Sequence, residues 1–496
     1  QSHRFAQNAV RGAGWYAGAR ISVRLVGLLN TFILARLLDP TDFGVLALAA
    51  IFLAFLQIFS ESGVLLAINR LPAPSRKDYD SAWTLNIIIC STNAGIILLL
   101  APSLGDIFGN HQVTSALYVL ALSPFLQGFS NIGIVNLRRE LQFRREFAYL
   151  ALTRVAGFVF GIAAALYFRN FYGLAIAQVV NSAAALILSY IFSPYRPSIT
   201  LSAARGILAF SFFALLSNLA TFFNEKADRF VIGQFGDPEK TGVFVVGSEV
   251  GALPLSEIVG SWNRTAFLSF MKMLREGDSI SAALREAMSV TCVLALGIAA
   301  GVMATAPEFV LILLGQKWVS AIPIVGLGAL SGAFTIIAQI GSQALTAHRY
   351  YSQVAVRTTI LASLAPFCAY AGYQIDDFQG VMVARVLQTF ALASITIAMT
   401  CRYLEIRPIE WFAVLWRPSL ALLAVLGANM VLEPQLLGLG TLPIFAIKGA
   451  ILAPVYFATI FLMWLMARKP RGAESLVLAM VTSYFRKIDS IEHHKS

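Results

Sequence analysis

The chain has 496 residues, a net charge of +11 and 58% apolar residues, whereas only 13% of its residues are charged. With a mean hydropathy of +0.72, this composition lies far outside the range of soluble globular domains. It excludes a soluble enzyme, and it disfavours a nucleic-acid-binding protein because no soluble basic domain is present. The sequence therefore predicts an all-α integral membrane protein.

Fourteen apolar runs are long enough to cross a hydrocarbon core, which takes about 20 residues of helix. The first run is too long for a signal peptide and has no small-residue cleavage site, so we treat it as a retained span. The predicted spans cover residues 15–38, 43–67, 82–104, 112–135, 147–168, 171–193, 205–233, 240–268, 288–314, 319–346, 354–372, 378–400, 411–432 and 442–467.

The distribution of Lys and Arg between the loops orients these spans. With the N-terminus in the cytoplasm, inner loops and tails hold 23 Lys and Arg residues, and outer loops hold three: Arg169, Lys240 and Lys317. Because positive loops stay on the cytoplasmic side, both termini are predicted to be cytoplasmic. Residues 472–488 have too few apolar residues to cross, and we expect a short interfacial helix there on the inner surface.

One short motif occurs twice in the chain. Residues 39–45 read DPTDFGV and residues 237–243 read DPEKTGV, and each copy joins two predicted spans on the outer side. Six spans separate the copies, and an even number of spans returns the chain to the same side. The two halves are therefore predicted to be parallel repeats related by an axis along the membrane normal.

The repeated motif has the chemistry of a turn into a helix. Its Asp accepts backbone N–H bonds, its Pro fits the first helical position, and its Gly permits close packing. The predicted structural residues are Asp39, Pro40 and Gly44 in the first copy and Asp237, Pro238 and Gly242 in the second. We predict an N-lobe over residues 1–195, a C-lobe over 196–404, two further helices over 405–468 and a cytoplasmic tail over 469–496, an arrangement suited to alternating access.

Both copies lie in longer stretches that resemble a known family. Residues 30–49 (NTFILARLLDPTDFGVLALA) and 228–247 (DRFVIGQFGDPEKTGVFVVG) are similar to the paired signatures of Wzx-like polysaccharide flippases. These form a branch of the multidrug/oligosaccharidyl-lipid/polysaccharide exporter superfamily. The resemblance implies a MATE-like fold and a secondary transporter rather than an enzyme, with no cofactor other than a coupling ion, H⁺ or Na⁺.

The same resemblance implies a substrate and partners. The substrate would be an oligosaccharide on a polyprenyl diphosphate, moved from the inner to the outer leaflet of a bacterial plasma membrane for exopolysaccharide, capsule or O-antigen assembly. Polysaccharide polymerase and co-polymerase machinery are the implied protein partners, alongside the lipid bilayer itself.

Charges inside the predicted spans favour an anionic substrate. Eleven Lys and Arg lie within spans against six acids, and each ionised side chain at the bilayer centre costs about 2.5–3.5 kcal/mol. Arg20, Arg24 and Thr31 share one helix face. Two arginines one turn apart repel unless an anion lies between them, and a diphosphate fits the planar fork of Arg.

We therefore assign candidate roles to the polar residues within spans. Candidate diphosphate ligands are Arg20, Arg24, Arg154, Arg264 and Arg385; candidate sugar or cavity contacts are Thr31, Gln57, Glu61, Asn218 and Thr221; candidate coupling carboxylates are Asp228, Glu249 and Glu257. The polar stripes around Asn218 and Glu257 are equally compatible with interhelical hydrogen bonding, and Asp228 with a structural ion pair to Arg229. Arg357, Arg417 and Lys448 lie near predicted span ends and are expected to be interfacial.

A cation-coupled drug or metabolite exporter of the same fold is the closest alternative, although a cavity for cationic drugs is expected to be rich in acids. A membrane enzyme on lipid-linked sugars would need a sizeable loop with acid and base groups, and the outer loops are short. The four Cys have no ligand-like spacing, and no catalytic motif or metal site is expected.

Overall fold

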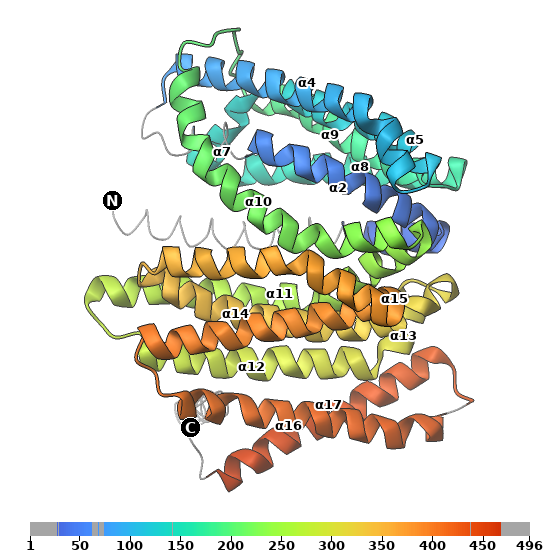
Figure 1. The fold of residues 1–496 in the computed structure, drawn as a ribbon, viewed down its shortest axis with the longest axis vertical. Helices are drawn as coiled ribbons and strands as arrows, with labels where there is room; N and C mark the ends of the chain where they lie inside the picture. Colours follow the sequence, from blue (N-terminus) through green and yellow to red (C-terminus); the bar gives the residue numbers. More distant parts are fainter. Residues whose placement is uncertain are drawn as a thin grey trace, which may run out of the picture. The chain divides into compact units, whose positions relative to one another are not determined.

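The computed structural model describes residues 27, 29–61, 68, 74–140, 142–436 and 438–467. All regular secondary structure in these described residues is helical, which confirms the all-α class (Figure 1). The chain forms two compact units that divide between Val245 and Val246. The predicted lobe boundaries refer to the sequence repeat and stay a prediction.

Within the described residues, the first unit contains a helical segment over residues 29–37 and eight helices. Its core is formed by apolar side chains of α2, α4, α5 and α9, among them Leu48, Ile97 and Leu117. The helices are α2 (Pro40–Glu61), α4 (Arg76–Ile107), α5 (His111–Leu120), α6 (Leu122–Gly128), α7 (Val135–Arg139), α8 (Phe143–Phe168), α9 (Tyr172–Phe192) and α10 (Ala204–Phe235), with a 3₁₀ turn η1 over Ile132–Ile134.

The second unit is built from long helices around α12 and α14, which carry many buried small side chains. Its first helix, α11, crosses the division between the units. The helices are α11 (Pro238–Glu276), α12 (Ser281–Ala304), α13 (Ala306–Leu313), α14 (Ile322–Ala347), α15 (Tyr351–Tyr403), α16 (Pro408–Leu432) and α17 (Thr441–Met466), with 3₁₀ turns η2 (Gln316–Ala321) and η3 (Glu433–Leu436).

Ten helices within the described residues are long and apolar enough to cross a membrane, so the chain is a multi-pass membrane protein. α15 joins two predicted spans, because its 53 residues contain a non-helical break at Asp376 and Asp377. Two predicted spans are each divided in the structure: residues 112–135 at Ala121, near Pro124, and residues 288–314 between α12 and α13, near Pro307. In each case the proline stands in the first turn of the second helix, where its missing N–H leaves no helical bond unmade. The total of fourteen spans and their sidedness stay predictions.

The two copies of the repeated motif contact each other within the first unit. α2 begins at Pro40 and α11 at Pro238, and Asp237 Oδ1 accepts a hydrogen bond from Lys240 N at 2.8 Å. A Cβ on Gly44 would overlap the carbonyl oxygen of Pro238, and a Cβ on Gly242 would overlap that of Pro40. Each copy therefore uses its glycine to pack against the proline of the other, and this reciprocal contact gives the repetition a physical reason.

Candidate functional site

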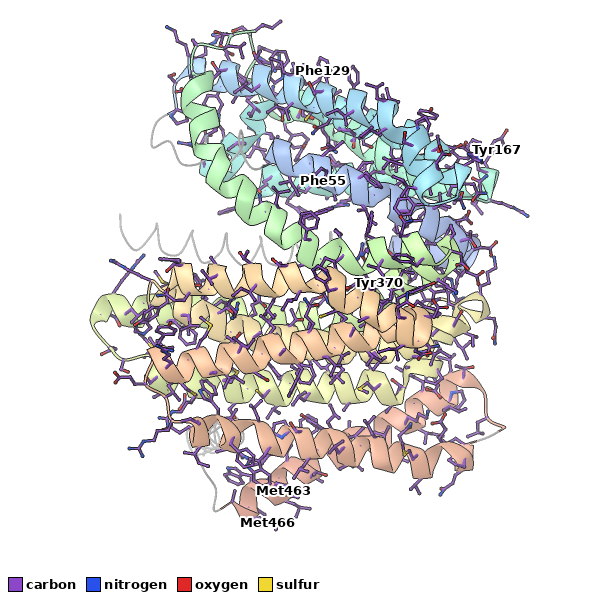
Figure 2. The ribbon with its side chains drawn as sticks, viewed as in Figure 1. Phe55, Phe129, Tyr167, Tyr370, Met463 and Met466 are labelled. Atoms are coloured by element: carbon purple, nitrogen blue, oxygen red, sulfur yellow. The ribbon has the colours of Figure 1, made fainter. Side chains whose placement is uncertain are left out.

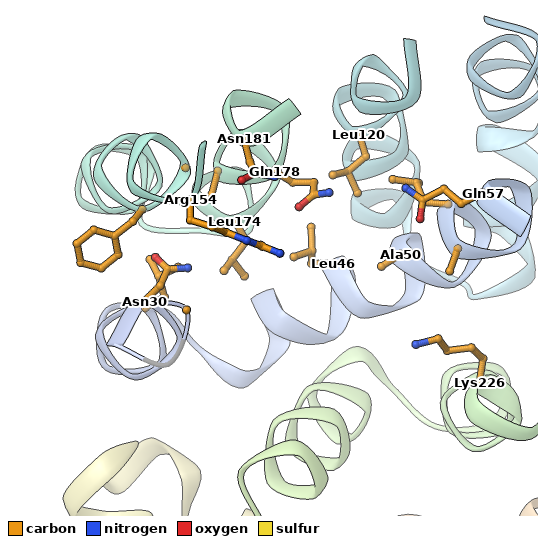
Figure 3. Close-up of a pocket in the computed structure, with 17 residues that line it drawn as sticks. Asn30, Leu46, Ala50, Gln57, Leu120, Arg154, Leu174, Gln178, Asn181 and Lys226 are labelled. Carbon is orange, nitrogen blue, oxygen red and sulfur yellow. The ribbon is translucent and has the colours of Figure 1, made fainter. Parts of the chain in front are cut away.

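The first unit contains a partly open cavity of about 400 Å³ between the helical segment at residues 29–37 and helices α2, α5, α8, α9 and α10 (Figure 3). Leucines such as Leu34, Leu46 and Leu120 make up much of its wall. The polar side chains of the wall are Asn30, Gln57, Arg154, Gln178, Asn181 and Lys226. The cavity size lies within the range of about 300–1,000 Å³ that is usual for small-molecule sites.

The charged side chains of the cavity wall are both positive. Arg154 on α8 and Lys226 on α10 are its ionisable members, and the described residues of the wall include no carboxylate. Figure 3 shows the two cationic heads directed inward from different helices, while the amides of Asn30 and Gln178 lie on the side of Arg154. Such a wall suits an anion that also carries hydroxyl groups, because amides both donate and accept hydrogen bonds.

Small residues on α8 and α9 position this wall. A Cβ on Gly161 would lie 2.6 Å from the Cβ of Ala177, and a Cβ on Gly157 would lie 3.1 Å from the Cβ of Asn181. These glycines let the two helices approach closely, as in membrane helix pairs generally. The approach places Arg154 and Asn181, from two helices, on the same cavity.

Two predicted site residues, Arg154 and Gln57, line this cavity. Thr31 lies nearby but donates its hydroxyl to Gly27 O at 3.2 Å. Asn218 is exposed on α10. Arg385 lies on α15 in the second unit and is half-buried. Arg20 and Arg24 fall outside the described residues, and the side chains of Glu61, Thr221 and Arg264 lie outside the described set as well.

The three candidate coupling carboxylates lie on two helices. Asp228 is 6% exposed on α10, whereas Glu249 and Glu257 are on the part of α11 that belongs to the second unit. Glu249 is exposed, and Glu257 accepts a hydrogen bond from Ser256 Oγ at 3.4 Å. The structure places Asp228 and Glu257 in different units, so they are not one cluster within either unit.

Three cations expected at the membrane interface are instead buried in the second unit, so that expectation was wrong. Arg357 donates to the hydroxyls of Ser342 and Thr396, and Arg417 donates to the carbonyl oxygen of Ala413. Lys448 is fully buried, with Nζ 3.0 Å from Glu308 Oε1 and 3.2 Å from Ala304 O. The position of these three cations near the ends of predicted spans does not show whether another helix buries them.

Sequence reasoning missed four polar residues of the cavity wall. Gln178 and Asn181 stand one turn apart in the span over residues 171–193, a polar pair in an otherwise apolar run that could have identified that face. Asn30 directly precedes Thr31, which was selected. Lys226 was not selected, because sequence spacing does not show which way a side chain of α10 points.

Comparisons with known proteins address the fold and the family. A family model described as "Polysaccharide biosynthesis protein" matches residues 33–323, more than half of the chain. The succinoglycan biosynthesis transport protein ExoT of Rhizobium meliloti is 24% identical over 66% of each chain. The lipopolysaccharide biosynthesis protein WzxC of Escherichia coli is 22% identical over 65% of this chain and 66% of its own. The chain thus matches about two thirds of the length of these relatives.

Solved structures share the fold. The lipid II flippase MurJ in an inward closed conformation superposes with a TM-score of 0.70, covering 91% of this chain and 99% of MurJ at 12% identity. The eukaryotic MATE transporter AtDTX14 superposes with a TM-score of 0.51 at 14% identity, covering 83% and 99%. The MATE-like fold expected from the sequence is confirmed.

Proposed function

Because the chain belongs to the polysaccharide biosynthesis protein family, we propose that it is a flippase for lipid-linked oligosaccharides. It moves an oligosaccharide on a polyprenyl diphosphate from the inner to the outer leaflet of a bacterial plasma membrane. The observation that carries this proposal is the cavity whose ionisable wall residues, Arg154 and Lys226, are both cationic. A cavity for cationic drugs would need the opposite charge, which disfavours the exporter alternative.

The two cations contact the diphosphate in different ways. Arg154 offers a planar fork of N–H donors that matches two oxygens of a diphosphate, and Lys226 adds a compact positive charge from another helix. The amides of Gln178 and Asn181 are placed to meet the first sugar. Arg20 and Arg24 of the first span are expected to extend the same cationic path.

The relatives support the substrate class. ExoT is named as a transport protein of succinoglycan biosynthesis, WzxC as a protein of lipopolysaccharide biosynthesis, and MurJ as a lipid II flippase. We propose that this chain likewise supplies polysaccharide assembly, with polymerase and co-polymerase as partners. Transport would be driven by H⁺ or Na⁺, with Asp228, Glu249 and Glu257 as candidate coupling groups.

Removal of either cation of the cavity wall is expected to impair substrate binding and transport. Arg154→Gln and Lys226→Gln are each expected to weaken substrate binding roughly 10- to 100-fold, because a hydrogen bond to a charged group is worth about 1.5–3 kcal/mol. The assay uses proteoliposomes loaded with a fluorescent polyprenyl-diphosphate oligosaccharide and follows its exposure to a membrane-impermeant reagent. The double variant Arg20→Gln/Arg24→Gln is expected to show a similar loss.

Arg144→Gln is the matched control, because Arg144 is an exposed arginine on the same helix as Arg154 and does not line the cavity. It removes the same charge and is expected to leave flipping unchanged. Wild-type activity in the Arg154→Gln/Lys226→Gln double variant would exclude the cavity as the diphosphate site. No flipping by the wild type, even under an imposed pH or sodium gradient, would favour a drug or metabolite exporter.

A further inference from the structure

A second pocket, of about 480 Å³, lies in the first unit at the start of α4. Its wall consists of Arg76, Tyr79, Asn136, Pro194, Tyr195 and Arg196. None of these residues lines the central cavity. Two arginines from different segments of the chain face one pocket, which is the arrangement that binds a phosphate group.

The wall on one side is a linker, residues 193–203, that hydrogen bonds fix to α4. Asp80 accepts bonds from the Tyr195 hydroxyl, from Ser198 N at 3.0 Å and from Ser198 Oγ at 2.8 Å. Further along, Thr200 N donates to Thr84 Oγ1 at 3.0 Å. Burial and the bond to Asp80 raise the pKa of Tyr195, so its phenol stays protonated and keeps this bond across the physiological pH range.

The second arginine is held in place by the same linker. Arg196 Nη1 donates to Ser193 O at 2.8 Å and to Tyr195 O at 3.0 Å, and its guanidinium lies 5.8 Å from the ring centroid of Tyr190. A guanidinium has five N–H donors, so these contacts orient Arg196 and leave donors for a ligand. Arg76 has an exposed side chain, with Nε 3.9 Å from Asp80.

The pocket lies where a membrane surface is expected. α4 begins at Arg76, whereas the predicted span begins at residue 82, so the first turn of α4 is expected to lie beyond the hydrocarbon core. Both arginines belong to loops predicted to be on the inner side. Next to them, Ile199 and Leu201 are 83% and 51% exposed. The alternate residues of the linker, Ser198 and Thr200, form hydrogen bonds to α4. The linker therefore presents apolar side chains outward, beside a cationic pocket.

We propose that this pocket binds the phosphate of an anionic phospholipid headgroup from the inner leaflet. Arg76 and Arg196 hold the phosphate oxygens, and Ile199 and Leu201 meet the adjoining acyl region. Anionic lipids are drawn to basic groups at the cytoplasmic surface, and the exposed isoleucine and leucine favour a lipid over a soluble phosphate. This inference is independent of the flippase assignment.

The test measures the Tm of the full-length protein in neutral detergent, with added phosphatidylglycerol or phosphatidylcholine. Phosphatidylglycerol is expected to raise the Tm of the wild type more than phosphatidylcholine does. Arg76→Gln is expected to lose most of this difference while keeping the lipid-free Tm, because Arg76 is exposed. Arg196→Lys, which keeps the charge but not the fork, is expected to show a partial loss.

Lys77→Gln is the matched control, since Lys77 is exposed beside Arg76 and does not line the pocket. It is expected to keep the phosphatidylglycerol effect. An equal loss in Lys77→Gln and Arg76→Gln would reduce the effect to general surface charge and overturn the proposal. An arginine-dependent shift with inorganic phosphate, but none with phosphatidylglycerol, would also overturn it and assign the pocket to a free phosphate.

Discussion

Lys448→Met is expected to lower the stability of the protein by about 3–5 kcal/mol, seen as a lower Tm in detergent. Lys448 is fully buried, and its ammonium group lies 3.0 Å from the Glu308 carboxylate, which is itself only 8% exposed. Glu308 Oε2 has no hydrogen-bond partner among the described residues. The substitution leaves this buried negative charge without the group that neutralises it, at the junction of α12, α13, η3 and α17.

A double-mutant cycle tests the physical reason. Glu308→Gln in the Lys448→Met background removes the uncompensated charge, so the double variant is expected to be more stable than the sum of the single losses predicts. Lys272→Met is the control, because Lys272 is 77% exposed and its ion pair with Glu276 spans 3.8 Å. An exposed pair contributes about 0–1 kcal/mol. Strictly additive losses in the cycle would contradict a coupled buried pair.

Gly44→Ala and Gly242→Ala are expected to destabilise the first unit by about 1–3 kcal/mol each. In both cases the new Cβ overlaps the backbone carbonyl of a proline in the other copy of the motif. Backbone atoms cannot rotate away as the end of a side chain can, so helices α2 and α11 must move apart. Lower Tm and lower yield of folded protein are the measurements.

Gly95→Ala on α4 serves as the control for these two substitutions. A Cβ on Gly95 meets nothing within 4 Å, and alanine in a helix is favoured over glycine by up to about 1 kcal/mol. Gly95→Ala is therefore expected to keep or raise the Tm. If Gly44→Ala behaved in the same way, the reciprocal packing of the two turns would be wrong.

Much of the fold could be predicted because bilayer thickness dictates helix length. Most apolar runs from residue 147 onward coincide with helices between α8 and α17, and the 53-residue helix α15 breaks at Asp376 and Asp377, between the two spans predicted there. Breaks inside runs were missed where a proline fits the first turn of a new helix, as at Pro307. Hydropathy does not register such a break, because the residues on both sides remain apolar.

The candidate site could be predicted only in part. Arg154 and Gln57 were selected as costly polar groups in apolar spans, and both line the cavity. Lys226 was missed and Lys448 was placed wrongly for the same reason. The sequence gives the depth of a charge along its helix, but the neighbouring helices decide whether that charge meets a cavity, a carboxylate or lipid.

α10 packs against helices of the first unit, although the sequence repeat predicts it to begin the second lobe. Phe222 and Phe230 pack on Phe55 and Phe108 of the first unit, with ring centroids 5.5 and 5.9 Å apart (Figure 2 labels Phe55). The docked linker ties its beginning to α4, and the reciprocal turn ties its end to α2. These contacts therefore hold α10 within the first unit. α11 continues from the first unit into the second, and Pro254 in its second-unit part has no N–H, so the helix lacks one backbone hydrogen bond there.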